Sequence, residues 1–451
     1  MHLDEASLQL LTDALRKLDD GFASLPAISA EATHDPRLAA VMNEVAARMQ
    51  DNYPYFHPLY AGQMLKPPHP IARAAYALAT WINPNNHALD GGRASSAMEK
   101  EAVTQIAAMF GWKEFLGHLC GGGTMANLEA LWVAGQLAPG KKIVASDQAH
   151  YTHHRISSVL QLPFAEVVSD NRGRMDVKAL EDLLDGGDVG CVVATVGTSG
   201  TGSVDPLPEI LKLRECYGFR VHVDSAYGGY FTLAGNLDAE TRGSYDRIGE
   251  ADSIVIDPHK HGLQPYGCGC VLFRDPSVGA IYKHESPYTY FTSSELHLGE
   301  ISLECSRPGA SAVALWATQR LLPLVRGGEF AQMLEASRNA AVHFAGQLAD
   351  DAQWLVPFAP ELDIVVWARR AASASEISEL SQRIFDSAAK QNLHLALIRL
   401  PARFFTSQQH AFQSERETVL CLRSVLMKPE HHDWLDRIWA ILSRVADEVL
   451  A

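Results

Sequence analysis

The chain has 451 residues, of which 47% are hydrophobic and 20% charged, so it can bury a large core divided over two or three domains. Its net charge of −15 disfavours broad binding to nucleic acids or to anionic membrane surfaces. The N-terminal stretch lacks a secretion signal pattern, and no apolar run approaches the about 18 residues of a membrane span. Seven scattered cysteines indicate reduced thiols rather than a disulfide framework. We therefore expect a cytoplasmic protein without nucleic-acid, membrane or metal partners.

Apolar residues at three- and four-residue spacing predict two helices near the start of the chain, at 6–19 and 36–50. Residues 52–70 are rich in proline and aromatic residues, which predicts irregular extended chain. Helices and near-continuous apolar strands then alternate. The predicted helices are 98–110 and 124–136, and the predicted strands are 142–146, 164–169, 191–196, 220–224, 253–257 and 268–273. This alternation predicts an α/β fold with a mostly parallel sheet that is covered on both faces.

A candidate domain boundary follows the helix predicted at 309–325, where the sequence reads RGG at 326–328. Beyond it the pattern predicts helices at 328–349, 374–391 and 433–450, with strand-like segments at 363–369 and 418–426. We therefore divide the chain into an N-terminal segment (1–65), a large domain (66–325) and a smaller C-terminal α/β domain (326–451).

The stretch ADSIVIDPHKHG (251–262) places Lys260 between two histidines at the end of a buried strand. Lysine is seldom buried without a partner, and burial turns its amine into a nucleophile that can form a Schiff base. The alternation of Asp257, His259 and His261 leaves a metal site open as an alternative, because such side chains could share one face of a strand.

Polar groups also follow the other predicted strands. The glycines before Thr124 open a helix and suit a phosphate, although a plain glycine turn would look the same. Asp224 could hold a protonated ring nitrogen or cap a turn, and His150 lies just past another strand. Ligands of open α/β sheets bind at the carboxyl ends of the strands. A phosphate anchor, a carboxylate, an imidazole and a lysine together meet the needs of pyridoxal phosphate.

Six ordered motifs carry a family resemblance: GGGTMANLEAL, SDQAH, VGTSGTGSVDP, HVDSAYGG, ADSIVIDPHK and SRPGASAVALW. They lie within about residues 90–320 and resemble those of the group II pyridoxal phosphate-dependent amino acid decarboxylases, the family of the aromatic amino acid and glutamate enzymes. The resemblance implies a fold-type I transferase fold and a homodimer with its active sites at the interface. It also implies decarboxylation of an L-amino acid to the amine and CO2. The aromatic segment 53–60 makes aromatic substrates our first expectation, with acidic or small polar ones next.

The resemblance further implies roles for individual residues. Lys260 would form the Schiff base with the cofactor, His150 would stack on its ring, and Asp224 would pair with the pyridine nitrogen. The other implied cofactor contacts are Gly123 and Thr124 at the phosphate with His259 nearby, Thr198 at the ring hydroxyl, Ala226 against the ring, and Asp257 close to the phosphate. Tyr288 or Tyr290 would supply the proton to the product, although both could simply pack at a dimer interface.

Candidate substrate contacts are less well defined by the motifs. They are Tyr60, Asn86, His87 and Arg307, each of which could equally be structural. The sequence also departs from the family at His261, where a tryptophan is usual, and at Ser225, where alanine is common. These departures affect the expected substrate rather than the cofactor.

Two rival functions use the same motifs. An aminotransferase or carbon–carbon lyase of the same fold would share Lys260 and Asp224, but an aminotransferase would release a keto acid instead of amine and CO2. The pairing of SDQAH with DPHK favours the decarboxylase. A catalytically inactive cofactor-binding protein is the third possibility, and the presence of Lys260, Asp224 and His150 argues against it.

Overall fold

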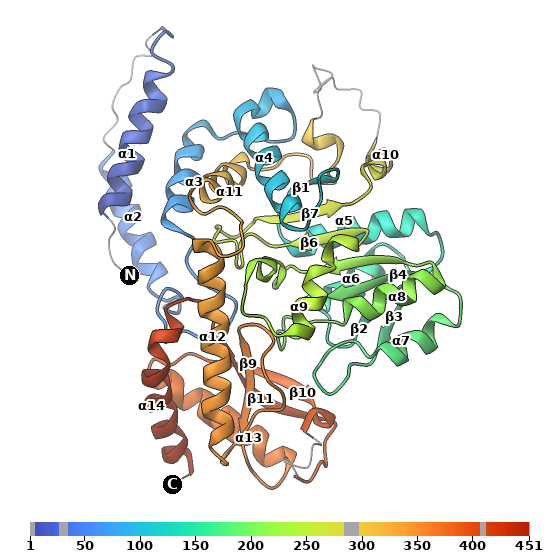
Figure 1. Cartoon of the computed structure of the whole chain (residues 1–451). Helices are drawn as coiled ribbons and strands as arrows, with labels where there is room; N and C mark the ends of the chain where they lie inside the picture. Colours follow the sequence, from blue (N-terminus) through green and yellow to red (C-terminus); the bar gives the residue numbers. More distant parts are fainter. Residues whose placement is uncertain (1–4, 27–34, 284–296, 406–411, 451) are drawn as a thin grey trace.

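The computed structural model describes residues 5–26, 35–283, 297–405 and 412–450. Its larger sheet has seven strands in the order β1-β7-β6-β5-β4-β2-β3 (Figure 1). The strands are β1 (Leu116–Cys120), β2 (Lys142–Ser146), β3 (Phe164–Val167), β4 (Val189–Thr195), β5 (Arg220–Asp224), β6 (Ser253–Ile256) and β7 (Gly269–Phe273). Only β7 runs antiparallel to its neighbours, β6 and β1, so the prediction of a mostly parallel sheet is confirmed.

Helices cover both faces of this sheet, as expected for strands that are apolar along their whole length. The helices of the large sheet region are α3 (Pro70–Ile82), α4 (Arg93–Met109), α5 (Gly123–Leu137), α6 (Thr152–Val159), α7 (Val177–Leu184), α8 (Leu207–Tyr217), α9 (Ala239–Asp246), α10 (Gly279–Tyr282) and α11 (Gly309–Leu321). Among the helices that the structure describes, none combines the length and apolar character needed to cross a membrane.

The smaller sheet lies in the C-terminal part of the chain and is antiparallel, in the order β10-β11-β9-β8. Its strands are β8 (Trp354–Leu355), β9 (Ile364–Arg369), β10 (Ala396–Pro401) and β11 (Thr418–Val425). Three helices accompany it: α12 (Glu329–Asp350), α13 (Ala374–Lys390) and α14 (His431–Leu450). This arrangement confirms the smaller C-terminal α/β unit, whereas the exact domain limits stay a prediction.

Helix α12 belongs to two hydrophobic cores at once. Its first turns place Phe330 and Leu334 in the core of the larger sheet, and its later turns place Phe344 and Leu348 in the core of the smaller one. Figure 1 shows this helix running from the large sheet region down alongside the small sheet. The candidate boundary at 326–328 therefore precedes a helix that both units share.

Two helices, α1 (Glu5–Asp20) and α2 (Pro36–Met49), lie along one side of the molecule in Figure 1. They match the helices predicted at 6–19 and 36–50. The residues between α2 and α3 form no helix or longer strand, as the proline-rich composition of 52–70 predicts. Instead, this segment packs against the C-terminal unit, because the backbone of Tyr60 and Ala61 pairs with that of His394.

Candidate active site

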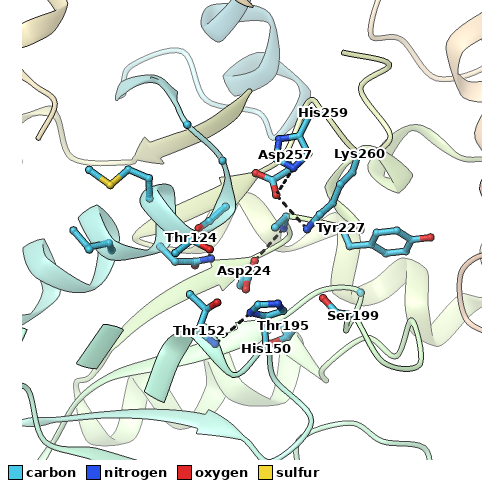
Figure 2. Close-up of a pocket in the computed structure, with 18 of the residues that line it drawn as sticks. Thr124, His150, Thr152, Thr195, Ser199, Asp224, Tyr227, Asp257, His259 and Lys260 are labelled. Carbon is cyan, nitrogen blue, oxygen red and sulfur yellow. Dashed lines mark hydrogen bonds and ion pairs between the residues drawn. The ribbon is translucent and has the colours of Figure 1, made fainter. Parts of the chain in front are cut away.

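The carboxyl ends of β2, β4, β5 and β6 meet at one edge of the large sheet, and a cavity of about 440 Å³ opens there (Figure 2). Each strand end contributes polar side chains, which is the usual position of a ligand site in this architecture. The cavity brings together most of the predicted cofactor contacts, namely Gly123, Thr124, His150, Asp224, Ala226, Asp257, His259 and Lys260. Residues that are far apart in the sequence therefore lie close together, because they follow neighbouring strands of the parallel sheet.

The start of α5 forms an anion cradle on one side of the cavity. Gly122 has a φ of +139°, and no side chain caps the helix that follows it. A Cβ on Gly123 would lie 2.7 Å from Asp257 Oδ2, so a side chain there would displace the carboxylate. Backbone N–H groups at an uncapped helix start favour an anionic group such as phosphate.

Lys260 is held in the cavity by Asp257, next to the cradle. Its Nζ lies 3.1 Å from Asp257 Oδ2, and its side chain is 17% exposed. The same carboxylate oxygen lies 3.4 Å from His259 Nε2. This explains how a lysine can stand at the end of a buried strand: its charge is paired, and its amine still reaches the cavity.

Two buried polar atoms beside Lys260 have no hydrogen-bond partner among the described residues, Asp257 Oδ1 and His259 Nδ1. Buried polar groups are normally satisfied, so such atoms beside a cavity indicate a polar ligand. Burial lowers the pKa of His259, which favours its neutral ring. Together with the cradle, these atoms fit a group that carries a phosphate at one end and polar substituents on its ring.

Asp224 is fixed by two hydrogen bonds at the floor of the cavity. Its Oδ2 accepts from His153 Nε2 at 2.8 Å and its Oδ1 accepts from the Ala226 N–H at 3.0 Å. Burial alone would raise the pKa of this carboxyl, but the bond and charge of His153 together with the Ala226 N–H bring its pKa well below the usual range. Asp224 is therefore an oriented, ionised carboxylate.

A second buried histidine connects this floor to the cradle. His222 precedes Asp224 by two residues on β5, so both side chains point to the same face. His222 Nδ1 is hydrogen-bonded to Ser253 Oγ and its Nε2 to Asn127 Oδ1, each at 2.8 Å. Asn127 Nδ2 donates in turn to the Gly123 carbonyl at 2.8 Å. Burial lowers the pKa of His222 to about 3, so it links β5 to α5 as a neutral ring.

His150 lies on the wall of the cavity, just before α6 (Figure 2). Its Nδ1 accepts from the Thr152 N–H at 3.2 Å, which fixes the ring at the start of the helix. Burial lowers the pKa of His150, so it presents a neutral, flat ring to the cavity. His153, one turn further on, was not predicted; nothing in the run of histidines at 150–154 distinguishes the one that faces Asp224.

His261 turns away from the cavity and towards the C-terminal unit. Its Nε2 lies 3.2 Å from Asp363 Oδ2, and Tyr227 donates through its hydroxyl to Asp363 Oδ1 at 2.5 Å. Asp363 directly precedes β9, whereas Tyr227 lines the cavity. Since Asp257 faces Lys260 while His261 faces Asp363, the three side chains of the metal alternative do not converge.

Several predicted contacts lie outside the cavity lining in the single chain. Thr198 is buried and bonded to Thr201, at 2.8 Å between their hydroxyl oxygens. Asn86 and Arg307 both bind the buried Glu99, at 2.6 Å and 2.9 Å, which is a structural arrangement. The other residues outside the lining are Tyr60, which is buried beside Lys428, and His87, whose carbonyl accepts from the Gly299 N–H. Tyr288 and Tyr290 lie outside the described residues.

Residues 132–369, more than half of the chain, match the family described as the pyridoxal-dependent decarboxylase conserved domain. The chain belongs to this family. It is a pyridoxal phosphate-dependent enzyme. Because its similar relatives are amino acid decarboxylases, it is an amino acid decarboxylase, that is, a carboxy-lyase. The resemblance noted in the motifs and the cofactor inferred from them are thereby confirmed.

Individual relatives differ in the substrates that their names record. An L-tyrosine decarboxylase of Enterococcus faecium is 27% identical, over 79% of this chain and 76% of its own. An L-aspartate decarboxylase of Thermococcus kodakarensis is 26% identical, over 82% of this chain and 93% of its own. Among solved structures, Oryza sativa TDC with PLP and tryptamine has a TM-score of 0.79 at 17% identity, covering 99% of this chain and 97% of its own. This structural similarity confirms the fold.

Proposed function

We propose that this decarboxylase acts on an aromatic L-amino acid and releases the corresponding amine and CO2. The observation that carries the choice of substrate is the charge of the cavity. Among its described lining residues, Lys260 is the only lysine or arginine, whereas Asp224, Asp257 and Glu304 are acidic. A substrate with a second carboxylate needs a further cation to bind it, and an aromatic side chain does not.

The roles of the cavity residues follow from their positions. When bound, pyridoxal phosphate supplies an electron-accepting pyridine ring for the pair released as CO2 leaves. The uncapped start of α5 would hold its phosphate, and Asp224, ionised and oriented by His153, would hold a proton at its ring nitrogen. His150 would cover the ring face, and Lys260 would present the amine that binds the cofactor covalently.

The immediate partners of Lys260 support this assignment. Asp257 Oδ2 holds Lys260 Nζ near the cradle, and Asp257 also lines the cavity. An amine that leaves the cofactor when substrate arrives would remain paired with this carboxylate instead of becoming an isolated buried charge. Tyr288 or Tyr290 is our proposed source of the proton that the product receives, and Thr198 our proposed contact to the ring hydroxyl.

We also propose a homodimer in the cytoplasm. Helix α2 exposes a run of apolar side chains, Leu38, Val41, Met42, Val45 and Met49, each at least 45% exposed. Trp81 and Ile82 at the end of α3 are likewise exposed. Contiguous exposed apolar side chains on a helix are typical of an interface, and a second copy of the chain would cover them. Asn86 and His87 lie close behind α3, and the family resemblance implies that this loop reaches the partner's site.

The second candidate substrate is an acidic amino acid, because several relatives carry the name of L-aspartate decarboxylase. This reading requires a cation from outside the described lining, such as one from the partner subunit. An assay of the purified, cofactor-loaded enzyme with L-tyrosine, L-tryptophan, L-phenylalanine, L-aspartate and L-glutamate separates the two. We expect amine and CO2 from the aromatic set; turnover of L-aspartate alone would overturn the proposed substrate, and keto acid without CO2 would point to transamination.

A further inference from the structure

A second cavity, of about 350 Å³, lies where four parts of the chain meet. Its walls come from the segment before and within α3, from Leu263, from Met333 of α12, and from residues 428–430 after β11. It shares no lining residue with the active-site cavity. Three of its lining side chains are lysine or arginine, Lys66, Arg73 and Lys428, and one is acidic, Glu430. Burial lowers the pKa of His69, a further lining residue, which favours its neutral ring. The cavity is thus rich in cations in a chain that is acidic overall.

The two lysines of this cavity are held by neutral groups. Lys428 is 3% exposed, and its Nζ donates to the Tyr60 carbonyl at 2.6 Å. The Nζ of Lys66 donates to the Met427 carbonyl at 3.2 Å. Within the part of the chain that the structure describes, neither amine is paired with a carboxylate. Glu430 acts on both amines, and Asp363 on Lys66, only through longer-range charge.

Lys428 is buried and Lys66 is half-buried. Holding their ammonium groups without a counter-ion costs free energy, since charges removed from water are normally paired. Burial accordingly lowers the pKa of Lys66 to about 8 and, with the charge of Lys66, lowers the pKa of Lys428 to about 7. A bound anion would remove this cost for both amines together. By contrast, Lys260 in the active site already has its carboxylate partner.

We infer that this cavity is a second ligand site that binds a small oxyanion of the phosphate or carboxylate class. Lys66 and Lys428 would contact it from the inner wall, and Arg73, which is exposed on α3, would contact it from the rim. The site lies beside the loop of Lys260, because the His69 N–H donates to the Leu263 carbonyl at 3.0 Å. An anion bound here would join the N-terminal segment to the C-terminal unit.

Calorimetry with inorganic phosphate tests this site. The enzyme must be saturated with pyridoxal phosphate, so that the cofactor's own phosphate already occupies the α5 cradle, and chloride must keep the ionic strength constant. We expect saturable binding of one phosphate per chain. Lys66→Met and Lys428→Met should each weaken it about tenfold or more, as expected when a charge-assisted contact is lost. Lys178→Met, at an exposed lysine of α7, is the matched control and should leave binding unchanged.

Two exposed residues of opposite charge keep the test decisive if a buried lysine variant does not fold. Arg73→Met should weaken phosphate binding and Glu430→Gln should strengthen it, because the two residues lie on the same cavity and differ in sign. No saturable binding to the wild-type holoenzyme would overturn the inference, as would binding that none of these four substitutions changes. Decarboxylation is not the readout, so failure here is distinct from failure of the proposed substrate.

Discussion

His153 Nε2 lies 2.8 Å from Asp224 Oδ2; both side chains are buried, Asp224 at the floor of the active-site cavity and His153 behind it. This contact joins α6 to the end of β5. It supplies a hydrogen-bond donor to the carboxylate that we assign to the cofactor's ring nitrogen. The pKa of Asp224 therefore depends on His153, a residue that lies outside the cavity lining.

Replacing His153 by asparagine should raise the pKa of Asp224, because the histidine's bond and charge lower it. The charge of Asp224 exists above its pKa and is lost as pH falls through it. The acid limb of kcat should therefore move to higher pH, and kcat measured at a fixed pH on that limb should fall about tenfold for each pH unit of the shift. The pH dependence of the cofactor's absorbance would report the same change. His154→Asn, at an exposed neighbour, is the control, and equal profiles for both variants would contradict this role.

Lys260→Ala should remove the visible absorbance of covalently bound cofactor and abolish amine formation, because the amine paired with Asp257 is lost. Absorbance spectroscopy and a CO2-release assay check this. Lys178→Ala, at an exposed lysine on α7, should change neither. Turnover retained by the Lys260 variant would refute the central assignment.

Gly123→Ala should weaken cofactor binding about tenfold or more, since an added Cβ would lie 2.7 Å from Asp257 Oδ2 and disturb both cradle and carboxylate. Equilibrium titration with pyridoxal phosphate measures the effect. The matched control is Gly346→Ala in α12, where an added Cβ meets nothing within 4 Å and should raise helix stability by about 0.5–1 kcal/mol. Equal cofactor affinities in the two variants would count against the cradle.

Asp363→Asn should destabilise the fold by about 1–3 kcal/mol near neutral pH, because Tyr227 and His261 lose a buried anionic partner. Burial alone would raise the pKa of Asp363, but His261 and Tyr227 bring it below its usual value. A depressed carboxyl pKa contributes stability that is present above the unfolded-state pKa and lost as pH falls through the folded pKa.

Urea unfolding from pH 2 to pH 7 measures this dependence, because the loss falls below the usual carboxyl pKa of about 3.9. The wild type should lose stability more steeply than the Asp363 variant as the solution is acidified. Asp386→Asn, at an exposed position of α13, should follow the wild-type curve. Parallel curves for wild type and Asp363→Asn would show that the carboxylate makes no such contribution.

The paired substitutions Tyr288→Phe and Tyr290→Phe test the proton donor. We expect one of them to slow amine formation by about 100-fold or to divert it to side products, as loss of a general acid does. Product analysis by chromatography, made for each single variant and for both together, identifies which. If neither changes the rate or the products, the proton comes from elsewhere.

The sequence predicted the strands near the site because each is a short buried apolar run followed by polar residues. It missed β1, whose residues Leu116–Cys120 include a glycine and a histidine that interrupt the apolar pattern. It also missed α3, since the proline-rich stretch before it suggested irregular chain while Pro70 in fact occupies the first helical turn. Local patterns therefore located the elements of the sheet better than those that pack around it.

The same limit applies to the site. Lys260, Asp224 and His150 could be found because each stands in a motif at a strand end. The partners of Asp224 and His261 could not be found in this way. His153 becomes a neighbour of Asp224 only when α6 packs against β5, and Asp363 becomes a neighbour of His261 only when the two sheets pack together. A contact that forms only in the tertiary structure does not appear as a local pattern in the sequence.

The shared helix α12 has a consequence for how this protein can be divided. The core of the larger sheet includes Leu362, Ile364, Val425 and Met427, all of which come from the C-terminal unit. A chain cut at the RGG turn would leave the cofactor-binding sheet without these side chains and without the first turns of α12. The C-terminal unit thus contributes to the hydrophobic core of the region that binds the cofactor. A chimera that takes this unit from a relative would have to keep the packing of that shared core.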